Sequence, residues 1–198
     1  DVLATTYQFW GNYHSERGDA ARAIPLCRQA AEAFKQVGGE DSLQYGRSLA
    51  RLAQAYQALD DPKRALPLYE QSAAIIKRVQ GEQHNDYASL LQAIGLAKAA
   101  TGDISGGADA LRRSVEIRRQ VLGADHLDLA RSLYAQAVLF HNMKVYNQAE
   151  PRYRQALEIV KKHQGTEADS LQADLLGSLA GWYRDQGDFA NAEPLMRQ

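Results

Sequence analysis

The stretch RALPLYEQSAAII, residues 64–76, decides the fold, because close counterparts of it recur along the chain. Shifting the sequence by 42 residues in either direction aligns it with ARAIPLCRQAAEAF (21–34) and SGGADALRRSVEI (105–117), and a further shift brings in NQAEPRYRQALEI (147–159). Self-similarity at a fixed period of this length is typical of repeat architectures, in which one small unit stacks on the next. The repeat therefore predicts the organisation of the whole chain.

Each repeat carries two small residues that lie twelve positions apart. The second members are Ala23, Ala65, Gly107, Ala149 and, after one inserted residue, Ala192; the first members are Gly11, Ala53, Gly95, Ala137 and Ala180. Small side chains on both helices of a pair allow the two axes to approach at the short end of the usual spacing. The pairs therefore predict a hairpin of two closely packed helices in every repeat.

Larger residues at helical spacing from these small pairs predict the core between the two helices. On the first helix they are Tyr7, Leu49, Leu91, Leu133 and Leu176, and on the second helix Cys27, Tyr69, Leu111, Tyr153 and Met196. We expect first helices at 2–16, 43–58, 87–101, 128–142 and 170–185, and second helices at 20–37, 62–80, 104–122, 146–163 and 188–198. Asp41 with Gln44, and Asp169 with Gln172, predict reciprocal caps at two helix starts.

The turns inside the hairpins carry a second recurring signal. A glycine followed by an aspartate occurs at Gly18-Asp19, Gly102-Asp103 and Gly187-Asp188. The glycine suits the left-handed residue that ends one helix, and the aspartate suits the cap of the next. Asp60-Asp61 keeps only the cap, and Lys144-Val145 keeps neither. We therefore expect a different turn in the fourth hairpin, with Asn142 in the left-handed position.

The repeat resembles the tetratricopeptide repeat (TPR). The small pairs, with an aromatic residue three positions after the first member at Tyr56, Phe140 and Tyr183, match its pattern. The period of 42 and the linkers GEQHNDYA (81–88) and LGADHLDLA (122–130) are similar to the kinesin-light-chain subtype. The resemblance implies an all-α, right-handed superhelical solenoid of antiparallel helix hairpins. The usual linker proline after histidine is replaced by Asn85 and Leu127.

One TPR solenoid domain is expected over 1–198, with repeats at about 1–40, 41–82, 83–124, 125–166 and 167–198, the last of them truncated. A single hairpin cannot bury its apolar face, so stacking supplies the stability. The sequence starts at an aspartate and ends within a helical pattern, and we expect it to be an excerpt of a longer protein.

The bulk composition excludes several classes of protein. With 45% hydrophobic residues, 24% charged residues and a net charge of −1, the chain is typical of a folded protein without a general attraction to nucleic acid or anionic membranes. No run of apolar residues is long enough for a membrane span, and no signal peptide is recognisable. One cysteine excludes an internal disulfide. We expect a cytoplasmic protein.

The resemblance implies that the first helix of each hairpin lines a concave groove. Removing the predicted core positions leaves one helix face in each repeat, made of Thr5, Gln8, Phe9, Asn12, Arg47, Ala50, Arg51, Gln54, Ser89, Gln92, Ala93, Leu96, Arg131, Tyr134, Val138, His141, Asp174, Ser178 and Arg184. The candidate peptide-binding groove residues on these faces are Gln8, Asn12, Arg47, Arg51, Gln54, Gln92, Arg131 and Tyr134. Amides can pair with a peptide backbone, and guanidinium groups bind carboxylates through two parallel hydrogen bonds. The sequence thus predicts a partly acidic peptide near Arg47, Arg51 and Arg131. The alternative for each arginine is a solvated surface residue.

Other candidate sites have simpler interpretations. The basic run Arg112, Arg113, Arg118 and Arg119 is predicted to form a solvated outer face, with no nucleic-acid contact. No two of the five histidines share metal-ligand spacing on a helix, so no metal or other cofactor is expected. His84 and His126 recur at one linker position, which favours a structural role, and Cys27 stands at a core position. The groove lacks most groups of the family's two-carboxylate clamp.

These observations favour a non-enzymatic scaffold that binds a peptide or protein segment. Two alternatives stay open. The chain could be the regulatory or sensing arm of a larger enzyme or signalling protein, such as a caspase-like protease, or it could self-associate through the open ends of the solenoid. A downstream histidine and cysteine dyad would favour the regulated protease.

Overall fold

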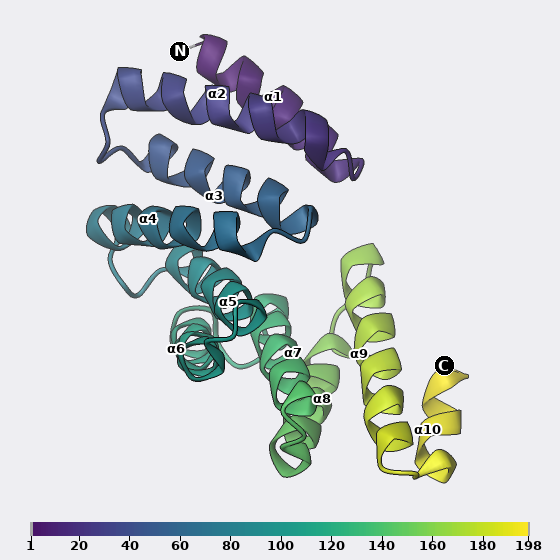
Figure 1. Ribbon diagram of the computed structural model, residues 1–198. Coiled ribbons are helices and arrows are strands. Elements are labelled where there is room, and N and C mark those ends of the chain that lie inside the picture. The colour runs from purple at the N-terminus through teal and green to yellow at the C-terminus, as the bar shows by residue number, and fades with distance from the viewer. Residues whose placement is uncertain (1, 198) are drawn as a thin grey trace. The chain divides into compact units, whose positions relative to one another are not determined.

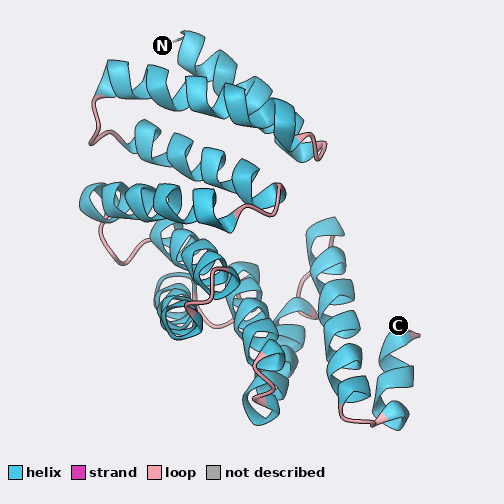
Figure 2. Ribbon diagram, viewed as in Figure 1, coloured by secondary structure: helices cyan, strands magenta, loops and turns pink. Residues whose placement is uncertain are grey.

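The computed structural model describes residues 2–197, which form ten helices and no strand (Figures 1 and 2). The helices, in chain order, are α1 (Val2–Glu16), α2 (Ala20–Gly38), α3 (Leu43–Ala58), α4 (Pro62–Gln80), α5 (Asn85–Ala100), α6 (Ile104–Leu122), α7 (Leu127–Asn142), α8 (Tyr146–Val160), α9 (Thr166–Asp185) and α10 (Phe189–Met196). The predicted helices are therefore present, and most of their boundaries agree within one or two residues. Gln198, which the prediction placed in the last helix, lies outside the described residues.

The chain divides into two compact units, Asp1–Ala110 and Leu111–Gln198, and the division falls within α6. In the first unit, α1 packs on α2 and α3 on α4, while contacts of α2 with α3 and of α4 with α5 join successive hairpins. In the second unit, α7 packs on α8 and α9 on α10, and α8 contacts α9. These contacts join helices that are neighbours in sequence, as stacked hairpins require.

The predicted small residues lie where the paired helices meet. Ala23, Ala53 and Ala65 in the first unit, and Ala137 and Ala149 in the second, are completely buried. The backbones of α5 and α6 lie close together, since a Cβ atom added to Gly107 would lie 2.7 Å from the carbonyl oxygen of Gly95. A residue without a Cβ atom is thus required at position 107 by the distance between the two helix backbones.

We expect Gly107→Ala to lower the free energy of unfolding by about 1–3 kcal/mol, because the added methyl group meets a backbone oxygen that cannot turn away. Gly177 in α9 is the matched control, since a Cβ atom there meets nothing within 4 Å. Gly177→Ala should raise the free energy of unfolding by about 0.5–1 kcal/mol, because alanine loses less backbone entropy in a helix. Urea denaturation followed by circular dichroism measures both. Equal effects of the two substitutions would contradict the close packing of α5 on α6.

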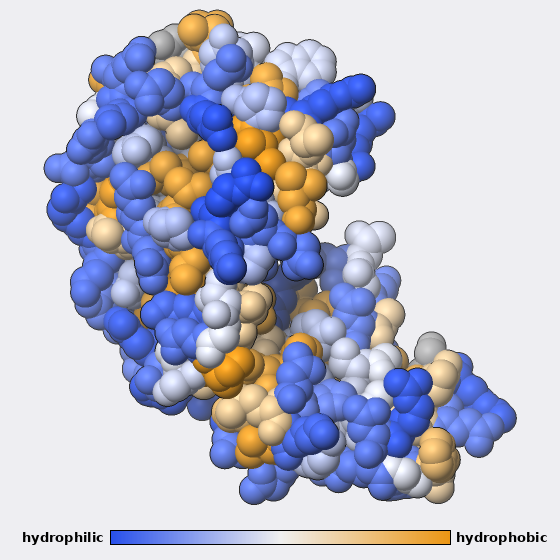
Figure 3. Space-filling model, in the orientation of Figure 1, coloured by the Kyte–Doolittle hydropathy of each residue, from blue (hydrophilic) through white to orange (hydrophobic). Residues whose placement is uncertain are grey.

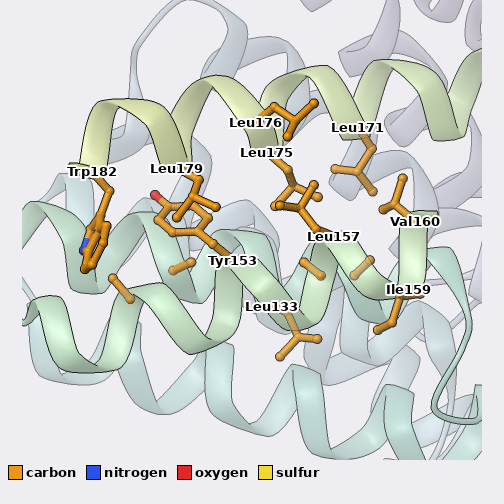
Figure 4. Packing of buried hydrophobic residues seen from close by; sticks show 14 of the residues in the cluster. Leu133, Tyr153, Leu157, Ile159, Val160, Leu171, Leu175, Leu176, Leu179 and Trp182 are labelled. Carbon is orange, nitrogen blue, oxygen red and sulfur yellow. The ribbon is translucent and has the colours of Figure 1, made fainter. Parts of the chain in front are cut away.

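The core of the second unit follows the predicted pattern (Figure 4). Leu171, Leu175 and Leu179 on α9 face side chains of α8 that include Tyr153 and Leu157. Tyr153 and Leu175 are completely buried. The prediction that Met196 belongs to the core is wrong, because its side chain is 71% exposed. The short α10 leaves Met196 with no further helix to cover it in the described part of the chain.

The turns within the hairpins repeat more regularly than their residues suggest. Gly18, Gly102 and Gly187 have positive φ angles, as predicted. The prediction for Asn142 is wrong, because Lys144 takes the left-handed position with a φ of 59°, as Asp60 does with a φ of 56°. Lys144 stands one repeat after Gly102, so the hairpin geometry has imposed the same backbone turn on an unfavourable residue. As expected, Val145 supplies no side-chain cap to α8.

Both predicted capping pairs are wrong. Helix α3 is capped by Ser42, whose hydroxyl accepts a hydrogen bond from the backbone nitrogen of Tyr45 at 3.3 Å. Serine at this position reaches the free amide of the first turn directly, so Asp41 is not needed. Helix α9 starts at Thr166 instead of residue 170, which places Asp169 inside its first turn. A carboxylate there still interacts favourably with the positive end of the helix dipole.

The prediction of a solvated basic run is wrong for Arg118, because this residue is only 4% exposed. Its Nη1 donates hydrogen bonds to the Asp128 carbonyl at 2.8 Å and to the Ser132 hydroxyl at 2.7 Å. Ser132 also lies 2.8 Å from the hydroxyl of Ser114. Burial lowers the pKa of the Arg118 guanidinium, and the Asp128 carboxylate opposes that shift. Arg118 therefore joins α6 to α7 inside the second unit.

Large apolar side chains are exposed on the first and last helices. On α1 these are Val2, Leu3, Phe9 and Trp10, and on α10 they are Phe189 and Met196. On the face seen in Figure 3, most of the surface is hydrophilic and apolar areas lie between the polar ones. The exposed positions on α1 include Trp10, whose equivalents Leu52 and Ile94 in the next two repeats are buried.

Candidate functional site

A hollow of about 240 Å³ opens in the first unit, among helices α1, α3, α4 and α5. Its lining comprises Gln8, Arg47, Ala50, Arg51, Gln54, Tyr69, Ser72, Ile76, Asp86, Ser89, Leu90 and Ala93. Four of the eight predicted groove residues are among them, namely Gln8, Arg47, Arg51 and Gln54. First helices of three successive repeats therefore contribute to one concave site.

Helix geometry explains how α3 presents its polar side chains to this hollow. Arg47, Ala50, Arg51 and Gln54 are spaced by three, one and three residues, so they lie on one face of the helix. Ala50 leaves room on that face, and Ala93 does the same on α5. On α3 the hollow thus has a small residue between longer polar ones.

The floor comes from the second helix α4 and is held in place by hydrogen bonds. The buried hydroxyl of Ser72 donates to the carbonyl oxygen of Gly46 at 2.7 Å, which ties α4 to α3. Tyr69 donates its hydroxyl hydrogen to Gln57 Oε1 at 2.7 Å. Burial raises the pKa of the Tyr69 phenol above its ordinary value, so the ring stays neutral. The floor is therefore uncharged and its side chains are fixed, so the charged groups of the site all lie at its rim.

The rim carries two arginines and one carboxylate. Arg47 Nη2 lies 2.8 Å from Asp86 Oδ2, an ion pair that joins α3 to α5. Arg51 Nη1 donates to the Gln54 side-chain oxygen at 3.2 Å. Arg51 has no carboxylate partner in the described residues, so its guanidinium keeps donors for a ligand. The three charged groups that line the hollow sum to one net positive charge.

The other predicted groove residues lie outside this hollow. Asn12 on α1 and Gln92 on α5 are half-buried and do not line it. Arg131 and Tyr134 belong to the second unit. Arg131 pairs with Glu167 at 2.5 Å and lies 3.8 Å from Asp128, while the Tyr134 hydroxyl lies 2.9 Å from that of Ser178. Internal partners thus occupy both side chains.

Sequence reasoning missed the part of the site that comes from other repeats or other faces. The repeat pattern places Tyr69 in the hairpin interior and indicates no role for Ser72 and Ile76, yet all three line the floor from α4. Asp86 was also missed, although a signal existed. It follows Arg47 by 39 residues, which is one repeat minus one helical turn, and stacked first helices bring such residues side by side.

The reactive residue types have structural surroundings. Cys27 is buried against Gly11, and burial raises the pKa of its thiol, which Arg51 only partly offsets. His84 and His126 cap α5 and α7 through Nδ1, which accepts a backbone hydrogen bond at 3.1 Å in both cases. Their predicted structural role is confirmed. Across residues 2–197, no three His, Cys, Asp or Glu side chains are grouped closely enough to hold a metal ion.

Comparisons with known proteins agree with this architecture. A family model described as tetratricopeptide repeat matches residues 1–77 and 107–162. No curated protein matches the sequence. None of the described helices is long and apolar enough to span a membrane.

Several solved structures have the same fold. BtubC (BKLC) from P. vanneervenii is 18% identical, with a TM-score of 0.82 over 99% of this chain and 78% of its own. A kinesin-light-chain-type protein with nearly identical TPR-like repeats from Podosopora anserina is 19% identical, with a TM-score of 0.79 over 100% and 94% of the two chains. A Rap protein complexed with competence and sporulation factor is 18% identical, with a TM-score of 0.84 over 98% and 52%.

The fold and these matches define an all-helical repeat protein. The chain belongs to the tetratricopeptide repeat family, because the family model covers more than half of it. The kinesin-light-chain likeness expected from the linkers is also present among the structural neighbours. The sequence identities to these structures are 18–20%, so the structures establish the fold of this chain and nothing further.

Proposed function

We propose that this protein is a non-enzymatic interaction scaffold, and that the hollow of the first unit holds an extended, partly acidic peptide. The observation that supports the proposal is the convergence of polar side chains from three first helices around a hollow with a neutral floor. Peptide recognition needs donors spaced along an extended chain, and separate repeats supply such spacing. The membership of the tetratricopeptide repeat family is consistent with a protein partner.

The chemistry of the lining favours a peptide that carries a carboxylate. Gln8 and Gln54 offer amide groups to a peptide backbone, since each amide can both donate and accept. Arg51 can form the two parallel hydrogen bonds that a carboxylate accepts. Arg47 can exchange Asp86 for a ligand carboxylate, because their ion pair is partly exposed and such pairs contribute little to stability.

The size of the hollow also favours peptide side chains. A volume of about 240 Å³ lies below the range of roughly 300–1,000 Å³ that is common for small-molecule pockets. It suits one or two side chains of a longer segment that continues across neighbouring repeats. The Rap structure, solved in complex with competence and sporulation factor, gives a structural relative that is occupied by a partner.

The double variant Arg47→Glu/Arg51→Glu tests the proposal. We expect it to weaken binding of a partner captured by the wild-type protein at least tenfold, because two attractive charges become repulsive towards an acidic ligand. Lys63→Glu/Arg78→Glu, on α4 and outside the hollow, makes the same charge change and is the control. Pull-down with quantitative mass spectrometry compares the three proteins. Equal retention in both double variants would move binding away from this hollow.

Arg131 is a weaker part of the proposed surface, because Glu167 and Asp128 already compensate its charge.

We place the protein in the cytoplasm as part of this proposal, since its one cysteine is a buried free thiol. No observation favours the regulatory arm of an enzyme. Self-association through α1 and α10 is a further part of the proposal, supported by the exposed Trp10 and Phe189. Light scattering at several protein concentrations tests it.

A further inference from the structure

A second hollow, of about 360 Å³, opens in the second unit between α6 and α8, above α7. Arginine side chains from two helices line it, Arg112 and Arg119 from α6 and Arg152 from α8. Gln136 lines it from α7. This hollow shares no residue with the candidate peptide site, and none of its residues was a predicted groove residue.

Gln136 is an exception to the repeat pattern. Its equivalents one repeat earlier, two repeats earlier and one repeat later are Ile94, Leu52 and Leu179, all buried apolar residues. Gln136 is equally buried, with 6% of its surface exposed. Burying an amide at an otherwise apolar position costs stability unless its groups are hydrogen-bonded. Stacking of the repeats therefore does not explain why a glutamine occupies this position.

Arg152 departs from the same pattern and contacts Gln136. Its equivalents in the other repeats are Leu26, Leu68, Ala110 and Leu195. Arg152 Nε donates to Gln136 Oε1 at 3.1 Å, and Nη1 donates to the Gln148 carbonyl at 2.8 Å. The guanidinium also lies over the Phe140 ring, 4.5 Å from its centroid. The arginine is thus held in one orientation, with Nη2 left for a ligand.

Arg119 differs from its equivalents in lacking a carboxylate. Lys35 pairs with Glu40 and Lys77 with Glu82, five residues further on in each case. The residue five positions after Arg119 is Ala124. Arg119 is exposed and makes no ion pair with another described residue. One repeat thus keeps the basic residue but lacks the acidic partner.

The electrostatics of the hollow follow from these three departures. It is lined by three guanidinium groups and one carboxylate, that of Glu116, which lies 2.8 Å from Arg112 Nη1. The net charge of its lining is therefore two positive charges. Burial lowers the pKa of the Arg152 guanidinium, and a bound anion would stabilise its charged form through charge-assisted hydrogen bonds. Val115 and Leu133 add an apolar floor.

We propose that this hollow binds a small organic anion that carries a phosphate or several carboxylates. Arg119 and Nη2 of Arg152 would meet the anionic group from two sides, since guanidinium groups match both oxyanions. Gln136 is a positioning residue, because it orients Arg152 through Nε. An apolar part of the ligand would cover Val115 and Leu133. The volume falls within the range of small-molecule sites.

Calorimetric titration and thermal unfolding at fixed ionic strength test this proposal, with inorganic phosphate, citrate and neutral glycerol as probes. We expect phosphate, citrate or both to bind and to raise the Tm, because a ligand that binds only the folded state stabilises it. Glycerol at the same concentration should not bind. The stronger of the two anions identifies whether phosphate or carboxylate is the recognised group. Binding of neither anion would overturn the proposal.

Three variants locate the binding. Arg119→Ala should weaken binding of the preferred anion at least tenfold, and Gln136→Leu/Arg152→Leu should abolish it. The leucines restore the side chains of Leu52 and Leu68 at the equivalent positions, so this variant should fold with an unchanged or higher Tm. Arg184→Ala, an exposed arginine of α9 outside the hollow, should bind as the wild type does. Full binding by the leucine variant would show that the anion sits elsewhere and would overturn the proposal.

Discussion

Replacing Arg118 with alanine is expected to lower the free energy of unfolding of the second unit by about 3 kcal/mol. The substitution removes the donor of two hydrogen bonds, to the Asp128 carbonyl and to the Ser132 hydroxyl. A buried acceptor left without a partner costs about 1–3 kcal/mol. The long apolar stem of the arginine is lost as well, which leaves a cavity between α6 and α7.

Arg118→Met separates the two contributions. Methionine keeps most of the buried stem and removes the charge, and the equivalent positions hold the apolar residues Phe34, Ile76 and Val160. Replacing a buried charge with an apolar residue of similar volume is often close to neutral. We therefore expect Arg118→Met to stay within about 1 kcal/mol of the wild type. Chemical denaturation measures both variants, and a fully stable alanine variant would contradict the structural role of Arg118.

Tyr153→Ala is the second substitution with a large expected effect. Tyr153 is completely buried and packs between α7 and α9, where Figure 4 shows its ring directed towards Leu179. Truncating a buried aromatic side chain costs about 3–5 kcal/mol through lost apolar burial and the remaining cavity. The same side chain contacts His141 through its hydroxyl, at a long 3.4 Å. We therefore expect most of the loss to come from the ring.

Tyr153→Phe is the matched control for that assignment. It keeps the ring and removes only the long hydroxyl contact, so the free energy of unfolding should fall by no more than about 1 kcal/mol. Thermal and urea unfolding of the two variants give the comparison. If phenylalanine cost as much as alanine, the polar contact with His141 would be the main stabilising interaction, and the packing account of this core would be wrong.

The repeat register predicted more of the fold than any local signal did. The period of 42 placed α3, α4 and α6 at their observed boundaries, because small residues and apolar positions agree over several repeats. Local capping patterns failed at Asp41 and Asp169, since Ser42 reached the first-turn amide instead and α9 begins earlier than its pattern indicated. Lys144 also shows that the repeat outweighs local preference, because the hairpin fixes a left-handed turn that a lysine side chain disfavours.

The candidate sites were harder to predict, because they combine residues from several repeats. Arg47, Arg51 and Gln54 could be placed on one face of one helix from their spacing alone. The α4 residues at the floor of the hollow could not be predicted from spacing. Their exposure to the hollow depends on how α3 and α5 pack on α4. Arg118 could have been recognised as buried by aligning it with Phe34, Ile76 and Val160, but its charge favoured the surface.

The most direct test of the proposed peptide site is photo-crosslinking to the partner that the pull-down identifies. A photoreactive amino acid at Ser89, which lines the hollow, should crosslink to one defined segment of that partner. The same group at Lys63 on α4 should not. Adding Arg47→Glu/Arg51→Glu should remove the crosslink from position 89. A crosslink that persists in that variant, or that forms only from position 63, would contradict peptide binding in this hollow.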